Sequence, residues 1–211
     1  MRTYFDMRTH FDNHVFHNEL ETKLLRLTTL PENLPKFTLL YGEPGTGKTS
    51  FAKWFAESIA TDTLYYPINE TGLSREVFDK IEGQLRHGNL YRDDTNVFDK
   101  VFIVDEFHNT TKNQQDKFKT LFDDLDDDCR FIFILNTNSR VKNKQVHDLI
   151  SPAMYSRMLR ISFDLPERSV EEVVIKSKQL YPDLSENVIR ATLPDHRQLV
   201  MKQQLANWEA A

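Results

Sequence analysis

The chain has 211 residues and a net charge of −5, and 39% of its residues are hydrophobic while 28% are charged. These values are typical of a globular protein with one α/β domain and a small addition, and they exclude a largely disordered chain. No apolar run reaches the roughly 20 residues of a membrane span, and the N-terminus lacks the apolar core of a signal peptide. The single cysteine, Cys129, excludes an internal disulfide and favours a reducing, cytoplasmic location, or a nuclear one in a eukaryote.

The first part of the chain alternates helical and strand patterns. Apolar residues at helical spacing predict one or two amphipathic helices over residues 11–29. Residues 37–41 predict a buried strand that ends where a glycine-rich loop begins. A helix with one apolar face follows over residues 50–60, and a second strand is predicted over residues 64–66.

The same alternation continues to the fifth predicted strand. The further elements are a helix over 74–85, a strand over 101–104, a helix opened by a capping box at Thr111–Gln114, and strands over 131–135 and 159–163. Strands that are apolar throughout are typical of a parallel sheet covered on both faces. We therefore predict an α/β fold: a doubly wound, five-stranded parallel sheet with helices on both faces.

Beyond Pro166 the strand patterns stop. Three helices are predicted there, with caps at Ser169, Ser185 and Asp195. A helical unit of this size would be marginal alone, so we expect it to pack on the sheet domain. The predicted domains are a nucleotide-binding α/β domain over 1–165 and a helical lid over 166–211.

The loop after the first strand fits the Walker A pattern, and a strand before it and a helix after it are the context that this motif requires. Its glycines let backbone N–H groups point at phosphates, and the following helix adds the positive end of its dipole. Lys48 is expected to reach the β- and γ-phosphates of ATP, and Thr49 to bind Mg²⁺. The residues expected to hold the nucleotide here are Gly42, Glu43, Pro44, Gly45, Thr46, Gly47, Lys48, Thr49 and Ser50.

Two acidic residues follow the third strand, where a Walker B segment is expected. Asp105 would hold Mg²⁺, and Glu106 would polarise the attacking water. Asn138 lies just past the fourth strand, at the edge of the sheet where ligands bind, and could orient water near the γ-phosphate. Asn136 or Thr137 could do this instead, and a simple turn is the structural alternative.

Two arginines are candidates for stabilising the charge that builds on the γ-phosphate. Arg157 precedes the fifth strand, and Arg197 begins the last helix. A surface arginine in a salt bridge is the alternative for each of them.

Together these motifs resemble the clamp-loader ATPases of the AAA+ superfamily, in particular the small subunits of replication factor C and their phage counterparts. The resemblance spans residues 8–205 and implies that Val15 and Phe16 flank the adenine. It also implies that Arg157 reaches the ATP of a neighbouring subunit, while Arg197 senses the γ-phosphate of its own. The departures from the pattern are Met158 for a cysteine, Pro194 for a glycine and His108 for an aspartate, and the family's helical collar does not follow the third lid helix in this sequence.

The resemblance implies an ATPase of DNA replication that loads a sliding clamp onto primed DNA. Its partners would be other AAA+ subunits, the clamp and the DNA backbone, with ATP and Mg²⁺ as cofactors and no membrane contact. Because the net charge is negative, DNA contact would require a local basic patch or several copies. The alternatives are a helicase loader of the same superfamily and a scaffold that binds ATP but scarcely hydrolyses it.

Overall fold

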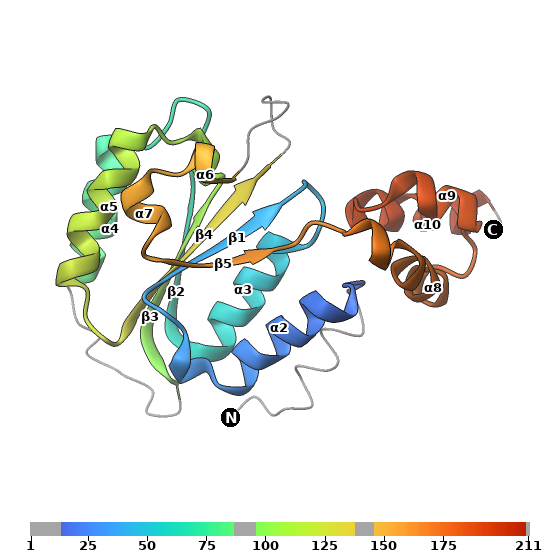
Figure 1. Ribbon diagram of the computed structural model, residues 1–211, viewed down its shortest axis with the longest axis horizontal. Coiled ribbons are helices and arrows are strands. Elements are labelled where there is room, and N and C mark those ends of the chain that lie inside the picture. Colours follow the sequence, from blue (N-terminus) through green and yellow to red (C-terminus); the bar gives the residue numbers. More distant parts are fainter. Residues whose placement is uncertain (1–13, 87–95, 138–145, 210–211) are drawn as a thin grey trace.

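A five-stranded parallel sheet forms the centre of the protein, as predicted. The computed structural model describes residues 14–86, 96–137 and 146–209. The strand order is β2-β3-β4-β1-β5, and all four strand pairings are parallel (Figure 1). The strands are β1 (Phe37–Gly42), β2 (Ala60–Pro67), β3 (Phe98–Asp105), β4 (Cys129–Asn136) and β5 (Met158–Ser162).

Helices cover both faces of the sheet because the buried strands are apolar on both faces. Ile132 and Ile134 of β4 join a core with α2 (Asn18–Thr29) and α3 (Lys48–Ile59). Phe131, Phe133 and Leu135 point to the other face. There they pack in a second core with residues of α4 (Arg75–Arg86) and α5 (Lys112–Asp124).

The predicted capping box opens α5. The Thr111 hydroxyl accepts from the Gln114 backbone N–H at 3.3 Å, and the Gln114 side chain accepts from the Thr111 N–H at 2.9 Å. The next residue, Gln115, is fully buried; its amide donates to Leu149 O at 2.9 Å and accepts from the Ser151 N–H at 2.6 Å. Gln115 thereby fixes the short helices that precede β5. The short helices of the sheet domain are η1 (Pro31–Asn33), η2 (Phe107–Asn109), α6 (Val146–Leu149) and α7 (Pro152–Tyr155).

The C-terminal helices pack on one another beside the sheet domain, with an apolar cluster of their own (Figure 1). They are η3 (Glu167–Ser169), α8 (Val170–Leu180), α9 (Glu186–Thr192) and α10 (His196–Glu209). Side-chain caps are present at Ser185 and Asp195, as predicted. The cap predicted at Ser169 is wrong: its side chain makes no cap hydrogen bond, because η3 already leads the chain into α8. The domain boundary after residue 165 stays a prediction.

The N-terminal helix begins later than the apolar pattern suggested. Helix α2 starts at Asn18, and residues 14–17 precede it without helical structure. Val15 belongs to the apolar cluster of the lid, whereas Phe16 belongs to a core of the sheet domain. The pattern over residues 11–29 therefore mixes contacts to two cores, and its first three residues lie outside the described ranges. The chain crosses between the same two cores again at Phe163 and Leu165.

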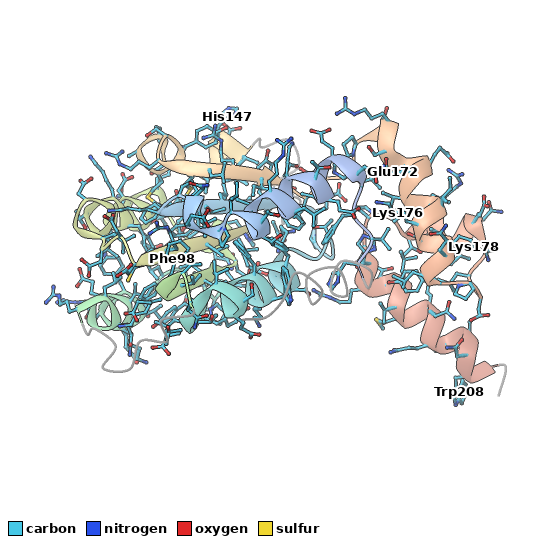
Figure 2. All side chains as sticks on the ribbon, turned by 90° about the horizontal axis from the view of Figure 1, so that it is seen from below. Phe98, His147, Glu172, Lys176, Lys178 and Trp208 are labelled. Atoms are coloured by element: carbon cyan, nitrogen blue, oxygen red, sulfur yellow. The ribbon has the colours of Figure 1, made fainter. Side chains whose placement is uncertain are left out.

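Ion pairs also join α2 to the lid. Lys176 donates to Glu21 at 2.7 Å and to Phe16 O at 2.9 Å, and Arg168 pairs with Glu19 at 2.6 Å. Glu172 accepts from the first N–H of α2. Figure 2 shows Glu172 and Lys176 on the side of α8 that is next to α2. No helix in the described ranges is long and apolar enough to cross a membrane.

Candidate active site

The glycine-rich loop lies between β1 and α3, and two of its glycines have a backbone conformation that other residues rarely adopt. Gly45 has φ = 79° and Gly47, which caps α3, has φ = 88°. A Cβ atom added to Gly45 would lie 2.2 Å from Asp195 Oδ1 of the lid. The His196 N–H also donates to Gly45 O at 3.1 Å. The loop is thus shaped both for close approach to phosphates and for contact with the lid.

Lys48 is folded back onto this loop. Its ammonium group donates to Gly42 O at 2.9 Å, to Glu43 O at 2.5 Å and to the Thr46 hydroxyl at 3.2 Å. The residue is 4% exposed. Burial lowers the pKa of its ammonium group to about 8, although nearby carboxylates, Asp164 first, oppose the shift. The carbonyl oxygens that bind the Lys48 ammonium group are neutral. A phosphate would give this ammonium group a negatively charged partner.

The predicted magnesium ligands lie side by side. The Thr49 hydroxyl donates to Asp105 Oδ2 at 3.0 Å, and the Tyr65 hydroxyl donates to the same oxygen at 2.8 Å. The Glu106 N–H donates to the other carboxylate oxygen at 2.8 Å. One hydroxyl and one carboxylate fit Mg²⁺, which takes few protein ligands and completes its shell with water and phosphate oxygens. Thr49 and Asp105 are the residues that would hold it.

Glu106 lies next to this pair in a strained backbone conformation, with φ = 56°. Its carboxylate accepts hydrogen bonds from Asn136 Nδ2, at 3.2 Å to each oxygen, and lies 3.2 Å from His108 Nε2. Asn136, one of the three residues proposed to orient water, is the last residue of β4 and lies beside Glu106. The predicted Asn138 lies outside the described residues.

A pocket of about 510 Å³ opens over the loop, a volume within the usual range for small-molecule sites. One wall is the loop together with Glu106 and Asn136, and the other comes from the lid and the segment before α2. Its lining residues are His14, Val15, Pro44, Gly45, Thr46, Gly47, Lys48, Thr49, Ser50, Glu106, Asn136, Tyr181, His196, Arg197, Val200 and Met201. The pocket therefore contains most of the predicted nucleotide-binding residues.

Three of the predicted binding residues do not line this pocket. Gly42 and Glu43 lie behind the loop, where their carbonyl groups accept from Lys48. The Phe16 ring packs edge-on against Phe163 in the sheet core and lies 3.4 Å from the position of a Cβ atom added to Gly47. Phe16 thus packs against the loop from the core of the sheet domain, while Val15 lines the pocket.

The lid side of the pocket contains a partly buried histidine, His196. Its Nδ1 atom is buried and has no hydrogen-bond partner among the described residues. Burial, with a smaller effect of His14, lowers the pKa of His196 to about 4, while Asp195 opposes the shift. A neutral imidazole beside Val200 and Met201 gives this wall an apolar character suited to a nucleobase.

The two predicted arginines lie at different places. Arg197 lines the pocket. Arg157 is at the amino end of β5, where Met158 pairs with Phe37, and it donates to Ala153 O at 2.9 Å. The loop starts at the other end of β1, about 16 Å away at ~3.3 Å per residue. Arg157 is therefore remote from the pocket of its own chain.

Sequence reasoning missed several pocket neighbours. Tyr65 could have been found, because β2 pairs with β3 in parallel and so brings its last residues close to Asp105. His14, Tyr181, Val200 and Met201 had no such signal, because their place depends on how the lid packs against the loop.

Comparisons with known proteins agree with this architecture. The sequence model described as "ATPase family associated with various cellular activities (AAA)" matches residues 38–165. No curated protein sequence matches the chain significantly. A DNA polymerase III gamma subunit-related protein from Thermotoga maritima superposes with a TM-score of 0.60 at 16% identity, covering 86% of this chain and 57% of its own.

A second solved structure is the Thermotoga maritima RuvB Holliday junction branch migration motor. It has a TM-score of 0.52 and 17% identity, and the match covers 82% of this chain and 54% of that protein. The chain thus spans little more than half the length of these two proteins. At such identities the likeness concerns the fold.

Proposed function

The chain belongs to the AAA ATPase family, and we propose that it is one motor subunit of a clamp-loader complex, which uses ATP to place a sliding clamp on primed DNA. The observation that carries this proposal is the position of Arg157, too far from the pocket of its own chain to contact a nucleotide there. An arginine so placed can complete a site on a second subunit. ATP hydrolysis would then depend on assembly.

Within one subunit, the proposed chemistry follows from the pocket. ATP would bind with its phosphates on the glycine-rich loop and its base against the lid, while Mg²⁺ neutralises phosphate charge. Glu106 would accept a proton from water as the water oxygen bonds to the γ-phosphorus and the bond to the bridging oxygen of ADP breaks. Arg197 would stabilise the transferring group from the lid, and Arg157 from the neighbouring subunit.

Contact with DNA is proposed for the surface of α4 and α5. Their exposed basic residues are Arg75, Lys80, Arg86, Lys112, Lys117 and Lys119. The three on α4 each lie within 4.0 Å of an acidic residue one turn away. The part of α5 up to Lys119 offers more positive charge, because Lys112, Lys117 and Lys119 outnumber Asp116 there. Such contacts with phosphates are independent of sequence and weaken with salt. The two similar solved structures, a DNA polymerase III gamma subunit-related protein and a Holliday junction branch migration motor, support a role on DNA.

ATP hydrolysis measured with primed DNA and a sliding clamp tests this proposal. We expect the rate to rise when both are added, to fall with salt, and to vanish in Lys48→Ala; light scattering should show an oligomer with ATP and DNA. Hydrolysis that DNA does not stimulate, or a monomer under all conditions, would refute the motor. Stimulation by a replicative helicase instead of the clamp would favour a helicase loader.

A further variant separates the enzyme from a scaffold. Glu106→Gln should retain ATP binding and lose turnover, because the amide cannot accept the proton of water. An unchanged slow rate in this variant would favour the ATP-binding scaffold.

A further inference from the structure

Two side chains that take no part in the proposed proton transfer contact the carboxylate of Glu106. Asn136, at the end of β4, donates from Nδ2 at 3.2 Å to each carboxylate oxygen. His108, in η2, places Nε2 3.2 Å from Glu106 Oε2. These contacts come from two different elements, so together they restrict both the rotation and the tilt of the carboxylate.

The hydrogen bond at His108 Nδ1 shows which of the two ring nitrogens carries the proton. The backbone N–H of Asn136 donates to His108 Nδ1, at 3.4 Å. A ring nitrogen that accepts a hydrogen bond holds no proton, so the neutral imidazole carries its proton on Nε2. Nε2–H therefore donates to Glu106, and one residue, Asn136, contacts the carboxylate directly and also orients the imidazole.

The rest of η2 fixes the position of this ring. Phe107 is fully buried in the core between the sheet and the helices α4 and α5. Its backbone carbonyl accepts a hydrogen bond from the Thr110 hydroxyl at 2.6 Å. The His108 side chain is itself only 12% exposed. A ring held on such a support loses little entropy when it binds a carboxylate, which makes it suited to orienting a neighbour.

We propose that His108 and Asn136 are positioning residues that hold the Glu106 carboxylate in the orientation needed to activate water. This inference rests on the proposed role of Glu106. His108 does not line the pocket, whereas Glu106 and Asn136 do. Removal of the His108 side chain should therefore change the orientation of the Glu106 carboxylate and leave nucleotide binding unchanged.

The test is steady-state ATP hydrolysis by His108→Ala, with ADP affinity and thermal stability measured in parallel. We expect kcat to fall at least tenfold with KM and ADP affinity unchanged, in a protein whose Tm stays above the assay temperature. His108→Gln, whose amide can donate to Glu106, should recover much of the rate. The exposed His147, on α6, supplies the matched control: His147→Ala should behave as wild type (Figure 2).

A second background identifies the residue through which His108 acts. In Glu106→Gln, adding His108→Ala should lower the residual rate no further, because the two changes affect one step. An unchanged kcat in His108→Ala, or a further loss in the double variant, would overturn the proposal. If Glu106→Gln alone retained turnover, the proposed role of Glu106 would fail first, and the positioning role with it.

Discussion

At the scale of single residues, the partly buried imidazole of His196 predicts how stability depends on pH. Its pKa is lowered from 6.5 to about 4 by burial, so the unfolded chain takes up the proton at a higher pH than the folded one. The contribution of the neutral His196 imidazole to the free energy of unfolding is fully present above pH 6.5. It is lost as the pH falls toward 4. We expect wild type to lose about 3 kcal/mol of unfolding free energy in this window through His196.

The measurement is urea unfolding between pH 4 and 7 for wild type and His196→Gln. The difference between the two curves should change across this window, because carboxylates titrate alike in both proteins. His147→Gln, at an exposed site, should show no such difference. Parallel curves for wild type and His196→Gln would contradict the prediction.

Residue roles could be predicted from sequence where the chemistry is local. Lys48, Thr49 and Asp105 follow from short motifs at strand ends, and the structure brings them together. The polar residue at the end of β4 could not be chosen from the sequence, because Asn136, Thr137 and Asn138 are all compatible with a strand end. In the structure Asn136 is the last residue of β4 that pairs with β1, opposite Gly42, and its side chain contacts Glu106; Asn138 lies outside the part of the chain that the structure describes.

At the scale of elements, Gln115 predicts the stability of the segment that carries Arg157. Its buried amide pairs with Leu149 O and the Ser151 N–H. Gln115→Leu would leave both groups without these partners, and we expect a loss of about 1–3 kcal/mol by chemical denaturation. Asn113→Leu, at an exposed position of the same helix, should stay within about 0.5 kcal/mol of wild type. Equal losses in both would contradict the role of Gln115.

The central strands β1, β3 and β4 could be predicted well because their apolar residues are buried on both faces of the sheet. The edge strand β2 is predicted only over 64–66 of Ala60–Pro67, because most of its residues are partly buried and its first half contains Asp62 between two threonines. The start of α2 could not, because the apolar residues before Asn18 satisfy two different cores at adjacent positions. Helical spacing assumes that one helix face meets one core.

At the scale of the whole molecule, Arg157 predicts that inactive subunits complement one another. The Arg157→Ala subunit keeps an intact pocket but cannot complete its neighbour's site, and the Lys48→Ala subunit keeps Arg157 but has a defective pocket. Each variant alone should therefore hydrolyse ATP at least about a hundredfold more slowly than wild type. A mixture of the two, with clamp and DNA, should exceed the sum of the separate rates. Arg160→Ala, at an exposed position of β5 three residues after Arg157, should retain the wild-type rate. A purely additive mixture would contradict the shared site.

The placement of Val15 and Phe16 in separate cores limits how the lid can move. Within the described residues, the chain joins the two bodies there and again between Phe163 and Leu165. Successive α-carbons keep a fixed spacing of about 3.8 Å, so neither tether can lengthen. The lid is thus held at both chain connections and by the ion pairs between α2 and the C-terminal helices, which together oppose its sliding over the sheet domain. The hydrogen bond from the His196 N–H to Gly45 O adds an attachment at the phosphate-binding loop itself.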